Sequence, residues 1–174
     1  MTTPDGTPGR HTRPGVRIGV DVGSARVGVA ASDVTGTFAH PVRTLPRDEQ
    51  HGSDLAALAV LVEELDAVEV VVGLPLLLSG QEGEAARRAR AYAVALTAQL
   101  GTVTVRLVDE RLTTVDAHRR LRDSGVPSRG QRKVVDQAAA VLILQTALDT
   151  EASSGRPPGE AVSTGGRRKK ERRR

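Results

Sequence analysis

One helix-length segment near the end of the chain constrains the fold more than any other feature. Within the expected helix Arg132–Leu148, the stretch Ala138–Leu144 contains no polar side chain. A helix on the surface of a globular protein has an apolar stripe on one side only, so this segment is expected to be buried nearly all round. The rest of the chain therefore has to supply the elements that enclose it.

Short strands are expected through much of the remaining chain. Valine-rich segments separated by turn residues predict two successive hairpins near the start, and a run that ends at Gly73 predicts a buried strand of a parallel sheet. A further strand is expected just before the acidic pair at 109–110. The expected strands are Arg17–Val22, Arg26–Ser32, Phe38–Thr44, Val68–Val72 and Thr102–Val108.

Helices are expected to alternate with the later strands. Apolar residues recur every three or four positions between Leu55 and Leu65 and again between Ala85 and Leu100. A short helix is expected at about Thr114–Ser124, before the final helix. Three antiparallel strands followed by alternating helices and strands indicate an α/β fold with a mixed sheet covered on both faces.

The length of 174 residues suits one domain, which we expect at 16–150. Residues 1–15 and 151–174 lack apolar periodicity and are expected to be a disordered arm and a disordered basic tail. The net charge is +4, but Arg167–Arg174 alone carries +6, so the basic character belongs to the tail. No apolar run approaches the roughly 20 residues that span a bilayer, so we expect a cytoplasmic protein without membrane contact.

Three acids stand where an ordinary core would not place them. Asp21 interrupts the first strand, Glu110 follows the last strand, and Asp136 lies in the first turns of the apolar helix. The chain has no cysteine and its four histidines are scattered, so a metal would be held by carboxylates, which suit Mg²⁺ or Mn²⁺. Each acid also has an ordinary explanation, respectively a turn, a solvated connection and the helix dipole.

Two further features would suit a phosphate backbone. Gly23 and Ser24 stand in a tight turn whose N–H groups could approach a phosphate, although hairpins use glycine routinely. A basic cluster flanks the break at Gly125–Pro127 and would attract phosphates, with a solvated helix face as the equal alternative. The cluster consists of Arg119, Arg120, Arg122, Arg129, Arg132 and Lys133.

Taken together, four segments resemble one family. They are the strand Asp21–Gly23, the strand exit Val71–Pro75, the run Asp109–Thr114 and the helix segment Val135–Ala140. In this order and at this spacing, over about Arg17–Leu148, the chain resembles the YqgF (RuvX-type) family of pre-16S rRNA nucleases. That family has a ribonuclease H-like fold and is related to Holliday junction resolvases.

The resemblance implies a five-stranded mixed sheet in the order 3-2-1-4-5. It implies that Asp21, Glu110 and Asp136 are catalytic acids that hold Mg²⁺ or Mn²⁺ and hydrolyse phosphodiester bonds, with pre-rRNA as partner. Two metals about 3.5–4 Å apart would activate water and stabilise the leaving oxygen. Without metal, the three acids would repel one another. The expected substrate contacts are Gly23, Ser24, Arg111, Thr113, Arg129, Arg132 and Lys133.

Three other functions stay open at this stage. A Holliday junction resolvase would cleave branched DNA as a dimer, and the sequence does not distinguish a monomer from a homodimer. A sugar kinase or actin-like protein also begins with an Asp-x-Gly hairpin, but that fold needs two such domains. A non-catalytic binding module on the same fold is the third, and the acids at all three motif positions weigh against it.

Overall fold

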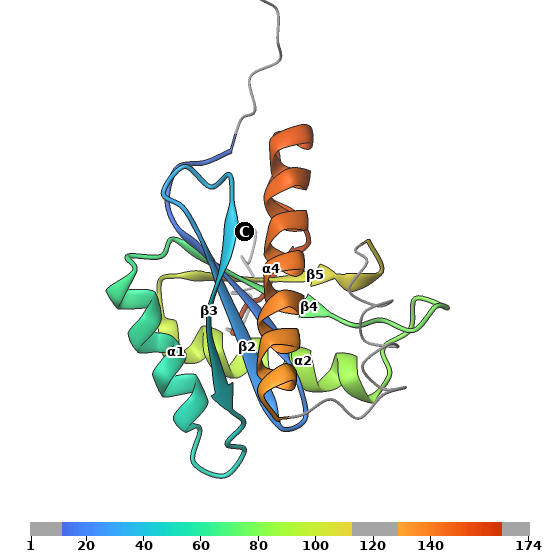
Figure 1. Ribbon diagram of the computed structural model, residues 1–174. Helices are drawn as coiled ribbons and strands as arrows, with labels where there is room; N and C mark the ends of the chain where they lie inside the picture. The colour runs from blue at the N-terminus through green and yellow to red at the C-terminus, as the bar shows by residue number, and fades with distance from the viewer. Residues whose placement is uncertain (1–11, 113–128, 165–174) are drawn as a thin grey trace, which may run out of the picture.

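A six-stranded sheet in the order β3-β2-β1-β4-β5-β6 forms the centre of the protein (Figure 1). The computed structural model describes residues 12–112 and 129–164, with the backbone alone for 129–133. In chain order the elements are β1 (Arg17–Val22), β2 (Arg26–Ser32), β3 (Ala39–Pro46), α1 (Ser53–Glu64), β4 (Glu69–Leu74), α2 (Glu84–Leu100), β5 (Thr104–Asp109), the 3-10 helix η1 (Glu110–Leu112), α4 (Arg129–Ser154) and β6 (Glu160–Ala161).

The direction of the strands changes at β1. This strand pairs antiparallel with β2, which pairs antiparallel with β3, whereas β1, β4 and β5 run parallel to one another. Short turns suffice for the antiparallel part, while α1 and α2 provide the crossovers that parallel strands need. The predicted mixed sheet with the order 3-2-1-4-5 is confirmed. The short strand β6 extends it with an antiparallel pairing to β5.

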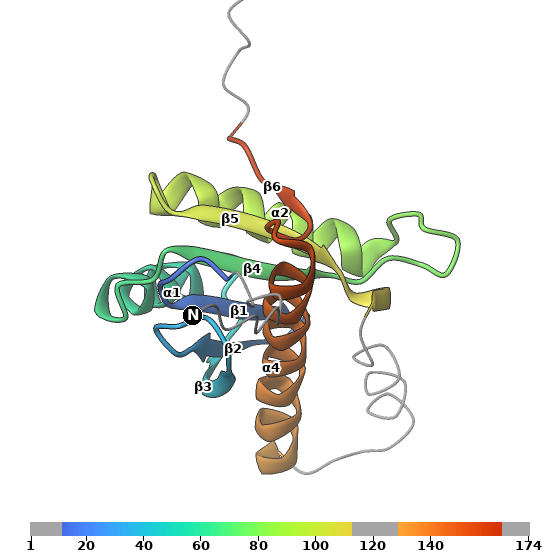
Figure 2. The same ribbon diagram turned by 90° about the horizontal axis from the view of Figure 1, so that it is seen from above.

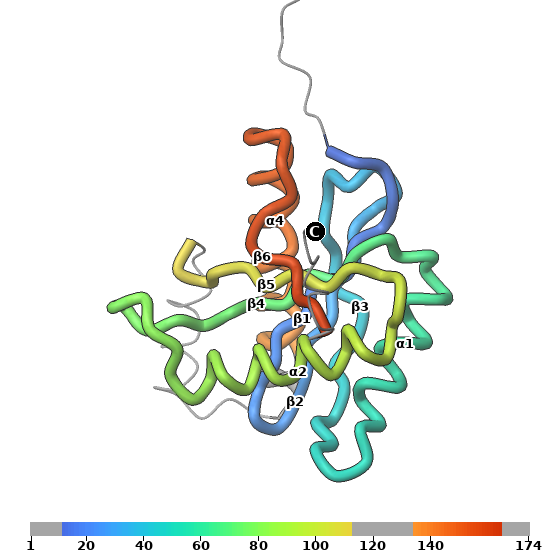
Figure 3. Tube along the Cα trace, turned by 180° about the vertical axis from the view of Figure 1, so that it is seen from behind, coloured from blue at the N-terminus to red at the C-terminus, as the bar shows by residue number. Residues whose placement is uncertain are grey.

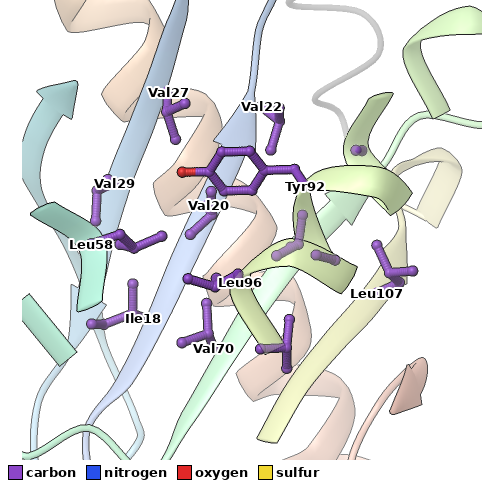
Figure 4. Packing of buried hydrophobic residues seen from close by; sticks show 14 of the residues in the cluster. Ile18, Val20, Val22, Val27, Val29, Leu58, Val70, Tyr92, Leu96 and Leu107 are labelled. Carbon is purple, nitrogen blue, oxygen red and sulfur yellow. The ribbon is translucent and has the colours of Figure 1, made fainter. Parts of the chain in front are cut away.

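Helices cover both faces of the sheet, as predicted. Figure 2 shows the sheet between α2 and α4, and Figure 3 shows α1 and α2 in front of it. On their face, Val20 and Val70 pack in one core with Tyr92 (Figure 4). On the other face, Ile143 and Leu144 of α4 belong to a second core. Because strand side chains alternate between faces, each central strand contributes to both cores.

The helix α4 is longer and less enclosed than predicted. It begins at Arg129 and ends at Ser154, and its side facing the sheet is buried. On its other side, however, Ala138 is exposed and Val141 and Leu142 are only half-buried. The prediction of burial nearly all round is wrong, because in the described part of the chain one sheet covers one side of this helix.

No helix in the described part of the chain is long and apolar enough to cross a membrane.

The folded domain continues past its predicted start. Arg13, expected in the disordered arm, places Nε 2.7 Å from Glu151 Oε1 and Nη2 3.0 Å from Glu69 Oε2. Both carboxylates are buried. The predicted boundary at residue 16 is wrong because these ion pairs order residues that have no apolar pattern.

The domain also continues past its predicted end at residue 150. Glu151 still belongs to α4, and Val162 N–H donates to Val105 O at 2.8 Å, which attaches the segment around β6 to the sheet. The prediction of a disordered tail is therefore wrong for residues 151–164, since a helix end and a strand pairing hold them. The outer parts of both predicted tails, and the helix expected at Thr114–Ser124, lie outside the described residues.

Candidate functional site

Asp21 lies near the end of β1, the strand at which the sheet changes direction. Its neighbours Val20 and Val22 belong to the core beneath α1 and α2, so the alternation of strand side chains turns Asp21 toward α4. The residue is only 2% exposed. An acid at this depth is costly unless a cation or hydrogen bonds compensate its charge.

Asp136 reaches the neighbourhood of Asp21 because β2 has no side chain at Gly28. Gly28 is the direct partner of Asp21 across the β1–β2 pair. A Cβ atom on Gly28 would overlap the carbonyl oxygen of Asp136 and lie 3.3 Å from the Cβ of Asp136. The backbone of α4 therefore rests directly on β2, and this contact brings Asp136 beside Asp21.

Glu110 reaches the site from the other side, over Gly73 of β4. A Cβ atom on Gly73 would overlap Glu110 Oε1 and lie 2.6 Å from Ile143 Cδ1. The β1–β4 pairing includes Val20 opposite Val72, and the next positions along the two strands are Asp21 and Gly73. Glu110 thus lies over the strand next to Asp21, on the same face of the sheet.

The structure therefore brings the three predicted acids together at one end of the sheet. Asp21 stands on the central strand, with Asp136 over one neighbouring strand and Glu110 over the other. Glu110 is 2% exposed and Asp136 4% exposed. Such a concentration of buried negative charge favours the binding of cations.

Arg26 is a charged residue of this site that sequence reasoning did not assign. It begins β2, and its Nε donates to Asp136 Oδ2 at 2.7 Å. The expectation that three unneutralised acids repel one another is therefore too simple, because Asp136 has a cationic partner in the protein itself. A signal was available, since Arg26 and Gly28 are two positions apart on one strand and so lie on the same face as Asp21.

The chemistry of the site fits a hard divalent cation. Asp21, Glu110 and Asp136 offer carboxylate oxygens, the donor type that Mg²⁺ and Mn²⁺ prefer. Within the described part of the chain, no three acidic, histidine or cysteine side chains stand in an arrangement ready to hold a metal ion. At Asp136, the bond to Arg26 occupies one carboxylate oxygen. The donor types therefore fit the metal, which would compete with Arg26 for that oxygen of Asp136.

Gly23 and Ser24, the two hairpin residues expected to contact substrate, differ in how accessible they are to a ligand. Gly23 N–H donates to Arg26 O at 2.8 Å, so it closes the hairpin and is not free to bind a phosphate. A substrate contact at Gly23 therefore stays a prediction, and it would have to use an atom other than this N–H. Ser24 is exposed at the tip of the hairpin, where a ligand could reach it.

Arg111 stands on η1, directly after Glu110. Its Nη2 lies 2.7 Å from Asp109 Oδ2, and this hydrogen-bonded guanidinium lowers the pKa of the Asp109 carboxyl. The side chain also passes close to Gly80 in the loop between β4 and α2. Arg111 is therefore held beside the site by an acid and a loop.

The other expected substrate contacts concern the segment that leads into α4. Arg129, Arg132 and Lys133 lie in the first turns of α4, ahead of Asp136, and the structure describes their backbone only. Thr113 lies outside the described residues, as does the rest of the basic cluster, at 119–122.

Comparison with protein families and curated sequences gives consistent matches. Residues 15–150 match the model of the RuvX family, which is described as Holliday junction resolvase. A protein of Frankia casuarinae is 58% identical over 142 residues, covering 82% of this chain and 70% of its own. A protein of Streptomyces coelicolor is 51% identical over 168 residues, covering 93% and 98%. Both carry the name "putative pre-16S rRNA nuclease".

Among solved structures, the chain is similar to RuvC of Thermus thermophilus in complex with a Holliday junction substrate. The TM-score is 0.56 at 15% identity, with 85% of this chain and 99% of the other covered. A second structure of Thermus thermophilus RuvC gives a TM-score of 0.54. At this identity the likeness concerns the fold alone.

Proposed function

Because the chain belongs to the RuvX family, we propose that it is a metal-dependent nuclease that hydrolyses phosphodiester bonds of pre-16S rRNA at the 5′ end. The family membership confirms the resemblance expected from the four sequence motifs. The substrate is the one named for the similar proteins of Frankia and Streptomyces. Since precursor rRNA is made in the cytoplasm of bacteria, the cytoplasm is the proposed place of action.

The observation that carries this proposal is the meeting of Asp21, Glu110 and Asp136 at one end of the sheet. Asp21 comes from a rigid central strand, and two glycines let the other acids approach it. In this proposal, the three buried acids together bind Mg²⁺ or Mn²⁺. Bound there, such ions would activate water and stabilise the leaving oxygen of the phosphodiester.

The remaining tasks fall to the protein's own side chains. Asp21 is the acid best placed to share ligands with both of the others, since it stands between them. Ser24 at the hairpin tip and Arg111 on η1 border the acids and would orient the substrate backbone. Arg129, Arg132 and Lys133, which precede Asp136, would neutralise phosphates that approach the acids.

The test is cleavage of precursor 16S rRNA by the purified full chain with Mg²⁺, with Mn²⁺ and with EDTA. Asp21→Asn keeps the shape of the side chain and removes its charge, so we expect it to abolish cleavage. Asp66→Asn is the matched control. Asp66 is exposed and precedes the start of β4, whereas Asp21 lies near the end of the parallel strand β1. Asn also tolerates the positive φ of 49° at this position. Cleavage that persists in EDTA, or in Asp21→Asn, would contradict the proposal.

The second candidate is cleavage of four-way DNA junctions, which the description of the matching family favours. Junction cleavage needs two active sites and hence a homodimer, whereas rRNA cleavage is possible for a monomer. The same assay with a four-way junction, combined with the molecular mass in solution, separates these candidates. A protein that binds either nucleic acid but cleaves neither would be the non-catalytic module instead.

A further inference from the structure

Arg26 connects two parts of the chain that are 110 residues apart, through its bond to Asp136. Its own backbone is fixed, because Gly23 N–H donates to Arg26 O and Arg47 N–H donates to Ala25 O at 2.9 Å. The arginine side chain is 29% exposed, whereas that of Asp136 is 6% exposed. The guanidinium therefore stands between the buried acids and the solvent.

The position of Arg26 conflicts with the use of Asp136 as a metal ligand. Nε lies 2.7 Å from Oδ2, so the guanidinium occupies one of the two carboxylate oxygens that Asp136 could offer to a divalent cation. Two cations close to one carboxylate also repel each other, so the ion pair and the metal compete for Asp136. Once released, an arginine on a fixed hairpin would stay at the mouth of the site, with a planar fork of donors suited to phosphate.

We propose that Arg26 is a displaceable counter-ion of the active site. It holds Asp136 while the site lacks metal, gives up this carboxylate when a divalent cation binds, and then binds a phosphate of the nucleic acid substrate. This inference rests on the proposed function, because it requires that the three acids bind metal and that the substrate is nucleic acid. It gives Arg26 a role in metal affinity and a role in substrate binding.

These two roles predict effects of opposite sign in one variant. With Arg26→Gln, the metal meets no competing cation, so the Kd for Mn²⁺ should fall about fivefold, which is typical of the loss of one partly exposed ion pair. The same variant lacks a phosphate contact, so its KM for precursor rRNA should rise about tenfold with a smaller change in kcat. A merely structural ion pair would instead weaken both properties or leave both unchanged.

The experiment combines calorimetric Mn²⁺ titration with cleavage kinetics on the full chain. Arg26→Lys keeps a positive charge and should stay within about twofold of the wild type in metal affinity. Its ammonium group replaces the planar set of guanidinium donors only partly. Arg43→Gln is the charge-matched control. Arg43 is an exposed residue of β3 opposite Val29, so it faces away from α4 and should leave both values unchanged.

A measurement on the wild type keeps the inference testable if Arg26→Gln does not fold. The NMR resonance of Arg26 Nε–H should move and exchange faster with water when Mg²⁺ saturates the site, because the bond to Asp136 is lost. An unchanged resonance, or a Kd and KM that move in the same direction in Arg26→Gln, would overturn the inference. Both outcomes leave the proposed nuclease intact, whereas a wild type that neither binds metal nor cleaves would refute the nuclease itself.

Discussion

Buried charges gather at both ends of the parallel strands, but their balance differs. At the start of β1 and β4, the carboxylates of Glu69 and Glu151 face three arginines, and both acids are 2% exposed. Those arginines are Arg13, Arg17 and Arg106, with ion-pair distances from 2.7 to 3.4 Å.

At the other end, the three buried carboxylates of Asp21, Glu110 and Asp136 lie together, and Arg26 forms an ion pair with Asp136. Each of the two buried carboxylates of Glu69 and Glu151 has two arginine partners, and such ion pairs order the chain and leave little demand for outside ions. A cluster of buried carboxylates favours the binding of cations. We therefore assign the end with Glu69 and Glu151, the arginine end, to stability. The end with Asp21, Glu110 and Asp136, the acidic end, is assigned to chemistry.

Asp21→Asn gives the sharpest test of this division. Cleavage should fall by about a thousandfold or more, because a central ligand is lost. The melting temperature in EDTA should not fall, since the substitution removes one of several mutually repelling charges. Kinetics and thermal unfolding of the same preparation measure both effects. A marked loss of stability without metal would mean that the acidic end also holds the fold together.

Glu151→Gln is the corresponding change at the arginine end. It leaves Arg17, which is 1% exposed, without its ionic partner, and should lower the free energy of unfolding by about 3 kcal/mol. The variant should keep kcat within about twofold of the wild type, because the residue is remote from the acids. Urea unfolding measures the free energy of unfolding, and single-substrate kinetics measure kcat. A large loss of kcat in folded protein would break the division.

Metal should stabilise the two variants unequally. A ligand at a hundredfold excess over its Kd stabilises by about 2.7 kcal/mol, so Mg²⁺ or Mn²⁺ should raise the melting temperature of the wild type by about 8 °C. Glu151→Gln should show a similar rise from its lower starting temperature, and Asp21→Asn should show little. Scanning fluorimetry with a series of metal concentrations tests this, and equal rises in both variants would argue against metal at Asp21.

The arginine end should also determine part of the acid sensitivity. Burial alone would raise the pKa of Glu151, but the hydrogen bonds from Arg13 and the charge of Arg17 lower it below the ordinary value of 4.5. Because the folded pKa is the lower one, this stabilisation is fully present above the ordinary value and is lost as the pH falls through the folded one. Between pH 6 and pH 3, the wild type should lose stability more steeply than Glu151→Gln. Parallel curves would contradict the assignment.

The smallest effect is expected for charges outside both ends. Removing residues 165–174 deletes the +6 of Arg167–Arg174 and spares β6, so it should raise KM about threefold near 0.1 M salt and flatten its salt dependence. The value of kcat should not change.

Replacing Arg129 and Arg132 should instead lower kcat, since they precede Asp136 and would position the phosphate. The reverse pattern would place the substrate along the tail.

Sequence patterns were sufficient for most strands and helices, and the resemblance to the RuvX family implied the strand order and the choice of the three acids. Alternation and helical periodicity are local patterns, so they predicted the elements from β1 to β5 and the helices between them to within a few residues. Asp21 and Asp136 were visible for the same reason, because an acid inside an apolar stretch is conspicuous without any knowledge of its neighbours. The two-residue strand β6 was missed, since it is too short to show a period.

Only the tertiary structure decided which of these residues meet. Gly28 lies under Asp136 and Gly73 lies under Glu110 because of where α4 and η1 rest on the sheet, which depends on packing across the whole chain. The pair of Arg26 with Asp136 depends on the same placement. So does the pair of Arg13 with Glu151, which are 138 residues apart. Contacts over such distances follow from the shapes of two assembled surfaces, and no periodicity within either segment encodes them.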